Sequence, residues 1–135
     1  MDLTEYALLY GITLILFAII DAVWIGVVSK DLYAHFLKNK MLNPPLWVAA
    51  AGFYVIFIAG LVYFAIAPSI NDQNIALGAL NGALYGFFTF STYQLTNVST
   101  LKGWPKRLVG IDIAWGTIAC FTASIMSYVV YKAIL

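Results

Sequence analysis

Long apolar segments follow one another along the chain, and the charged residues gather in the short stretches between them. Only two charged residues, Asp21 and Asp112, lie inside these segments. Each segment is longer than the ~20 residues that a helix needs to cross a hydrocarbon core of ~30 Å. The pattern therefore predicts four membrane spans, near residues 6–28, 46–67, 75–97 and 108–131.

The predicted spans are helices, because the alternation of a β-strand is absent and four strands cannot close a barrel. Pro44 and Pro45 precede the second span, where their missing N–H groups would be unpaired anyway, and Pro68 is predicted to close it. Residues 103–105 (Gly-Trp-Pro) separate the third span from the fourth. The predicted fold is an all-α integral membrane protein, a four-helix bundle in a single transmembrane domain of residues 1–135.

The composition supports this class: 63% of the 135 residues are hydrophobic and 10% are charged. A soluble domain has about 45–50% apolar and about 25% charged residues. The net charge is +1, so no strong field attracts polyanions. These values exclude a soluble enzyme, a disordered tail and a basic nucleic-acid binder. The expected partner is the lipid bilayer, and no nucleic acid is expected.

The basic residues predict the orientation of the spans. All but Lys132 lie in the first and third loops. The positive-inside rule places these two loops in the cytoplasm and both termini outside it. The expected location is the inner (cytoplasmic) membrane of the cell. The basic residues of the two loops are Lys30, Lys38, Lys40, Lys102, Lys106 and Arg107.

The first loop carries an amphipathic pattern. Tyr33, Phe36, Leu37 and Met41 fall on one helical face, and polar residues fall on the other. This pattern predicts a short helix that lies on the cytoplasmic membrane surface. His35 is then expected on the solvated face of that helix.

Metal and redox chemistry have few candidate ligands in this chain. Cys120 is the only cysteine and is expected to pack as a small thiol inside a helix bundle. His35 is the only histidine, so a zinc or haem site lacks a second imidazole. Two carboxylates with Asn97 would hold Mg²⁺ only weakly without a phosphate ligand. We expect no metal site and no cofactor.

The two aspartates within the spans are the main candidates for chemistry. A carboxylate at bilayer depth costs roughly 2.5–3.5 kcal/mol on insertion scales, so it normally faces the bundle interior and has a partner. Asp21 lies about 13 Å from Lys30, and Asp112 about 7–8 Å from Arg107, at 1.5 Å per residue. Both therefore belong to the cytoplasmic half. If they approach each other, one can keep a proton that is exchangeable near neutral pH.

Each aspartate begins the same short pattern, Asp-x-x-Trp. Asp21 precedes Trp24, and Asp112 precedes Trp115, by three residues. Because the two helices run in opposite directions, Asp21 is level with Trp115 and Asp112 with Trp24. An indole N–H only donates and an ionised carboxylate only accepts, so crossed Asp–Trp hydrogen bonds would satisfy both.

The third span is predicted to supply the other wall of a site. Gly78, Gly82 and Gly86 form a double G-x-x-x-G pattern that allows close approach of another backbone. We expect copies of the protein in a homo-oligomer to contact each other through this glycine face. Further along the same span, hydroxyl and amide side chains reach the level of the two aspartates. The predicted ligand-binding cluster, open toward the cytoplasm, comprises Asp21, Trp24, Tyr93, Thr96, Asn97, Asp112 and Trp115.

The chain also resembles a known family. The sequence T-Y-Q-L-T-N at residues 92–97, T-L-K-G-W-P at 100–105 and D-I-A-W-G at 112–116 is similar to the bacterial membrane family called domain of unknown function twenty-one seventy-seven. The resemblance covers essentially the whole chain and implies a compact four-span protein, without implying an activity. The family usually has an acid at the position of Gln94.

Three functions are open at this point. The first is binding or translocation of a small polar ligand, ion or proton by Asp21 and Asp112. The second is an enzyme or enzyme subunit that acts on a lipid head group, with either aspartate as the catalytic general acid or base. The third is an accessory or structural bundle in which the Asp–Trp pairs only fix the packing of the helices.

Overall fold

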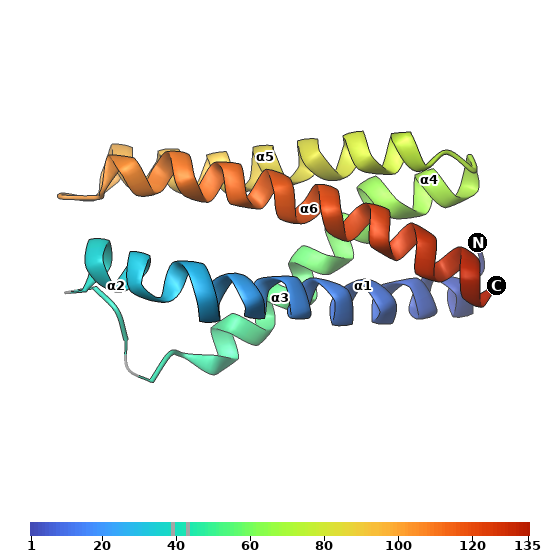
Figure 1. Ribbon diagram of the computed structural model, residues 1–135, viewed down its shortest axis with the longest axis horizontal. Coiled ribbons are helices and arrows are strands. Elements are labelled where there is room, and N and C mark those ends of the chain that lie inside the picture. The colour runs from blue at the N-terminus through green and yellow to red at the C-terminus, as the bar shows by residue number, and fades with distance from the viewer. Residues whose placement is uncertain (39, 43) are drawn as a thin grey trace.

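The computed structural model describes residues 1–38, 40–42 and 44–135, and every regular element in these ranges is helical. Four helical runs make up the molecule (Figure 1). The first comprises α1 (Leu3–Val23), η1 (Trp24–Ser29) and α2 (Lys30–Leu37), and the second α3 (Trp47–Leu61), η2 (Val62–Ile66) and α4 (Ala67–Asn71). The third is α5 (Ile75–Thr100) and the fourth is α6 (Lys106–Ile134).

The first run begins at a capping box. The side chain of Asp2 accepts a hydrogen bond from the backbone N–H of Glu5, and the Glu5 side chain accepts one from the backbone N–H of Asp2. The helix then continues through a π-helical segment, η1, directly into α2. The prediction of a separate surface helix in the first loop is therefore wrong. Residues 30–37 are helical, but they extend the first run, and Met41 lies outside any helix.

The second run also continues past its predicted end. We expected Pro68 to close it near residue 67, but the run extends to Asn71. Proline lacks the N–H that an α-helix interior needs. Here Pro68 lies in the first turn of α4, directly after the π-helical segment η2, where the regular α-helical ladder is already interrupted. The missing donor is therefore tolerated.

Three of the runs are long and apolar enough to cross a membrane: Leu3–Leu37, Trp47–Asn71 and Lys106–Ile134. The predicted spans near 6–28 and 108–131 lie within two of them, and the span near 46–67 lies within the third except for its first residue. The fourth, α5, has 26 residues, more than the ~20 that a span needs. Its C-terminal half is rich in Thr, Ser, Gln and Asn, which lowers its hydropathy. The chain is a multi-pass, all-helical membrane protein.

Glycines hold α5 against α6. A Cβ atom at Gly82 would overlap Ser124, and one at Gly86 would overlap the backbone carbonyl of Gly116. The double G-x-x-x-G pattern does allow close approach of a backbone, but that backbone is α6 of the same chain. Gly78 is likewise buried, against Ser69 of α4. The glycines are therefore covered by other helices of the same chain. Cys120, which lies near Gly86, is fully buried in this packing as expected.

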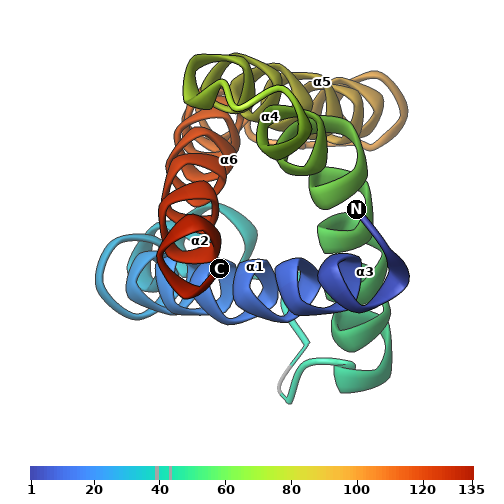
Figure 2. The ribbon, with the colours of Figure 1, turned by 90° about the vertical axis from the view of Figure 1, so that its right-hand side faces the viewer.

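The runs surround a common axis (Figure 2), with α1, α6 and α5 packed in sequence around it. The run that contains α3 crosses obliquely, and it meets α5 through η2 and α4. The two termini and the turn between α4 and α5 lie at one end of the molecule. The opposite end contains α2 and the connection from α5 to α6, and most of the basic residues lie in or next to these segments.

Candidate functional site

Asp112 is a buried carboxylate held by two neutral donors. It lies near the start of α6, and its side chain is 6% exposed. The hydroxyl of Tyr33 donates to Oδ1 at 2.6 Å, and Nε2 of Gln94 donates to Oδ2 at 2.7 Å. The two donors come from α2 and α5, so one carboxylate joins three helical runs. The continuation of the first helix through η1 into α2 is what brings Tyr33 to this position.

Gln94 connects this carboxylate to the loop between α5 and α6. Its side chain is 1% exposed, and its Oε1 accepts a hydrogen bond of 2.8 Å from Nε1 of Trp104. Gly103, which precedes the tryptophan, has a φ of 69°, in the left-handed region that favours glycine. The sharp turn there brings the Trp104 indole back over α5. The edge of that indole also meets the ring of Tyr93, with centroids 6.3 Å apart.

Asp21 has a partner of its own. The hydroxyl of Tyr54 on α3 donates a hydrogen bond to its carboxylate. Both side chains are half-buried. This contact joins α1 to the part of α3 that leans away from α5. Each aspartate is therefore bonded by a tyrosine from a neighbouring run.

The two tryptophans of the Asp-x-x-Trp patterns meet, but not in the predicted way. Trp24 and Trp115 stack, with ring centroids 4.3 Å apart and planes 6° from parallel. The predicted hydrogen bond from Trp24 to Asp112 is wrong: Nε1 of Trp24 has no partner in the described part of the chain. Trp115 lies beside Asp21 as a side-chain donor, as predicted, and the hydroxyl of Tyr54 also donates to that carboxylate. The stacked indoles lie between the first helical run and α6, and hydrogen bonds to the two carboxylates come from Tyr33, Gln94 and Tyr54.

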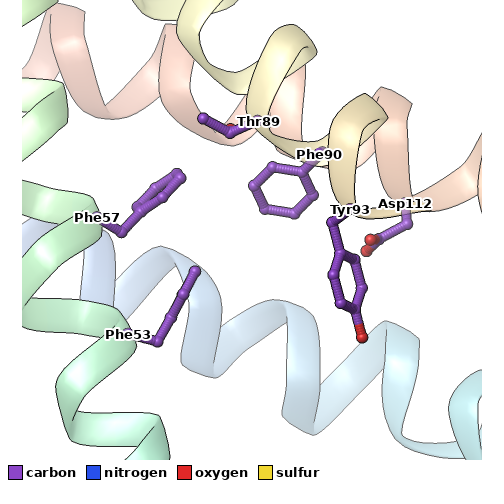
Figure 3. Close-up of a pocket in the computed structure, with 6 residues that line it drawn as sticks. All are labelled: Phe53, Phe57, Thr89, Phe90, Tyr93 and Asp112. Carbon is purple, nitrogen blue, oxygen red and sulfur yellow. The ribbon is translucent and has the colours of Figure 1, made fainter. Parts of the chain in front are cut away.

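A cavity of about 380 Å³ lies against Asp112. Figure 3 shows Asp112 and Tyr93 at one end, and Phe53 and Phe57 of α3 across from them. Its walls are mostly aromatic, and Asp112 is the one charged residue among them. Phe53 is 48% exposed and Tyr93 is 56% exposed, so the rim on the α3 and α5 sides faces outward. The lining residues are Phe53, Phe57, Thr89, Phe90, Tyr93 and Asp112.

Of the seven predicted binding residues, two line this cavity, namely Tyr93 and Asp112. Trp24 and Trp115 line a different, apolar hollow of about 350 Å³ between the first run and α6. Asp21 faces Tyr54 instead. Thr96 is exposed and Asn97 half-buried, and neither lines the cavity or makes a side-chain hydrogen bond within the described residues.

The sequence interpretation missed three polar members of the site, Tyr33, Gln94 and Tyr54. Tyr33 was assigned to a surface helix, and Tyr54 carried no pattern of its own. Gln94 had a detectable signal, because it continues the four-residue spacing of the buried glycines: α5 turns positions 78, 82, 86 and 94 toward the interior. The alternative spacing of fours and threes from Gly86 predicts Tyr93 and Thr96 instead.

The site offers few ligands for a metal ion. Within the ranges that the structure describes, no three His, Cys, Asp or Glu side chains come together. The hydroxyl of Thr89 is bonded to the backbone carbonyls of Tyr85 and Gly86. The cavity therefore presents a carboxylate and aromatic rings, and these suit an organic ligand better than a hard cation, which takes about six oxygen ligands.

Comparison with known protein families identifies a relationship. Residues 6–129 match the model of a family described as a predicted membrane protein, DUF2177. This confirms the resemblance that the motifs around residues 92–116 indicate. No curated protein and no solved structure matches the chain.

Proposed function

The chain belongs to the DUF2177 family of predicted membrane proteins, and we propose that it binds a membrane-soluble amphiphile in the cavity beside Asp112. The observation that carries this proposal is the lining of the cavity. Its walls are the rings of Phe53, Phe57, Phe90 and Tyr93, and one end is a carboxylate. Ligand sites are typically apolar clefts with a few polar groups that fix the orientation of the ligand.

The depth of the cavity suits a lipid-like molecule. Asp112 lies about 7–8 Å from Arg107 along α6, whereas Thr89 lies about 16 Å before the end of α5, at 1.5 Å per residue. The polar end is therefore nearer to the basic end of the protein, and the apolar part lies deeper. With α5 as the fourth span and the basic loops in the cytoplasm of the inner membrane, this is the orientation of a lipid in the cytoplasmic leaflet.

The cavity also has a rim that faces the membrane. Phe53 and Tyr93 line it and are about half exposed, while Trp104, Gln94 and Tyr33 surround Asp112 with a hydrogen-bonded network. A molecule dissolved in the bilayer can reach the rings between α3 and α5 without crossing that network. This favours an amphiphile over the small polar solute, ion or proton that the sequence alone suggested.

The test uses photoactivatable dodecyl probes, one with an alcohol head group and one with an amine. The protein is reconstituted in lipid nanodiscs, and the labelled residues are mapped by mass spectrometry. We expect at least one probe to label the cavity walls on α3 and α5. Thr89→Phe, which fills the cavity, is expected to reduce that labelling at least tenfold.

The matched control is Thr92→Phe. Thr92 lies on the same helix and makes the same kind of hydrogen bond, from its hydroxyl to the carbonyl four residues earlier at 2.7 Å. It is exposed and does not line the cavity. Labelling of the cavity walls should match the wild type in this variant. Labelling spread evenly over the lipid-facing surface, or equal in Thr89→Phe and wild type, would refute the proposed function.

A further inference from the structure

The interior of the protein carries two carboxylates whose described hydrogen bonds come only from neutral side chains. Tyr33 and Gln94 bond Asp112, and Tyr54 bonds Asp21. The basic residues all lie at the ends of the apolar segments. Charged groups within a membrane normally face the interior or a cavity and pair with one another or with backbone carbonyls, so a carboxylate there favours a positive charge beside it. At Asp112 the position for such a charge is the cavity itself.

The surroundings of Asp112 indicate what kind of cation fits. Tyr93 lies beside the carboxylate in the cavity, and Phe90 lies next along the same wall (Figure 3). The faces of aromatic rings attract cations, and aromatic cages with organic ammonium groups are their best-known use. A carboxylate and aromatic faces together therefore favour an ammonium head group.

Other head groups fit less well. A phosphate or sulfate would place like charges together in a medium of low dielectric constant, where their repulsion is strong. A bare Mg²⁺ or Ca²⁺ would need about six oxygen ligands, and the cavity offers the Asp112 carboxylate with a Thr89 hydroxyl that already donates to backbone carbonyls. A neutral alcohol would be accepted, but it would leave the charge of Asp112 unbalanced.

We infer that the amphiphile bound in this cavity has a cationic amine head group, which pairs with Asp112 and lies against Tyr93. This inference rests on the proposed function and narrows it to a ligand class. Recognition requires the negative charge of Asp112, whereas the aromatic walls hold the apolar chain. The charge of the head group and the apolar chain of the ligand are therefore recognised by different residues, and each can be tested separately.

The experiment compares the dodecyl amine and dodecyl alcohol probes, which have the same chain and both donate hydrogen bonds but differ in charge. In the wild-type protein we expect cavity labelling by the amine to exceed that by the alcohol at least tenfold. Asp112→Asn should reduce amine labelling to the level that the alcohol reaches in the same variant. Asp112→Glu, which retains the charge, should retain the preference. Asp31→Asn, which removes an exposed acid on α2, should change neither probe.

Equal labelling of the wild-type cavity by both probes, blocked in both cases by Thr89→Phe, would refute the cation while the proposed function stands. Absence of cavity labelling by either probe would refute both. If Asp112→Asn fails to fold, the ratio of amine to alcohol labelling in the wild type and in Asp112→Glu still tests the inference. Loss of the preference for the amine in an Asp112→Glu protein that still binds the alcohol would refute the inference.

Discussion

Trp24 and Trp115 face each other in parallel, with ring centroids 4.3 Å apart. They come from the first and fourth helical runs, and each lies three residues after an aspartate. Stacked aromatic pairs contribute about 0.5–1.5 kcal/mol beyond the area they bury. This contact therefore fixes the two aspartate-bearing helices relative to each other without using either carboxylate.

A double-mutant cycle measures that contribution. Trp24→Leu and Trp115→Leu should each lower the free energy of unfolding in detergent, with a coupling of about 1 kcal/mol between them. Phe121→Leu is the comparison, because Phe121 also lies on α6 but is 43% exposed and is not stacked on Trp24. The cycle of Trp24→Leu with Phe121→Leu should be additive. Equal coupling in the two cycles would show that the stacked pair is not the source of the coupling free energy.

Gln94→Leu should destabilise the protein by about 1–3 kcal/mol. The variant leaves the indole N–H of Trp104 without its acceptor and Asp112 without one donor, and buried groups that lose a partner cost about that much. Thr96→Val, on the exposed side of the same helix, should change stability by less than about 0.5 kcal/mol. Thermal unfolding followed by tryptophan fluorescence would measure both. Similar small effects in the two variants would show that the Trp104–Gln94–Asp112 network does not hold the fold.

Gly86→Ala should destabilise by about 1–3 kcal/mol, the usual cost of overpacking, because a Cβ there overlaps the carbonyl of Gly116. Gly110→Ala is the control: nothing lies within 4 Å of a Cβ at that helical position. Alanine is a better helix former than glycine by up to about 1 kcal/mol, so this variant should be as stable as the wild type or more so. Chemical denaturation in mild detergent would distinguish them. A Gly86→Ala protein of full stability that loses only a contact between copies would restore the oligomer interpretation.

The orientation of the spans can be tested by cysteine accessibility in a Cys120→Ala background. Asp72→Cys lies in the turn between α4 and α5, and Lys102→Cys lies at the opposite end of the molecule. With the basic loops in the cytoplasm, a membrane-impermeant maleimide should label residue 72 in intact cells and residue 102 only after permeabilisation. The reverse pattern would invert the topology and place the polar end of the cavity in the outer leaflet.

The helices could be predicted from the sequence because the length of an apolar segment and the positions of the charged residues that flank it are local properties of the sequence. Three of the four predicted spans coincide, to within one residue at the start of the second, with parts of helices that are apolar enough to cross a membrane. The ends were less accurate. Pro68 and the charged residues after Lys30 looked like boundaries, but the π-helical segments η1 and η2 carry the helices onward.

The candidate site was only partly predictable, because its hydrogen bonds join residues far apart in the chain. Asp112 was identified from its cost in a membrane, and Tyr93 from its helical face. Tyr33 is 79 residues from Asp112 in sequence, and no local pattern marks it as a partner. The aromatic wall from Phe53 and Phe57 depends on the oblique path of α3, which apolar periodicity does not encode.

The hydrogen bonds from Trp104 through Gln94 to Asp112 all point the same way. An indole N–H can only donate, so the amide of Gln94 must present its oxygen to Trp104 and its NH₂ to the carboxylate. Neither the indole nor the amide can accept a proton on one side and release another on the other. This series of hydrogen bonds therefore cannot transfer protons by the Grotthuss mechanism. Trp104 and Gln94 therefore offer Asp112 no path for proton hopping, and among the two bonded neighbours of Asp112 only the hydroxyl of Tyr33 is able to relay a proton.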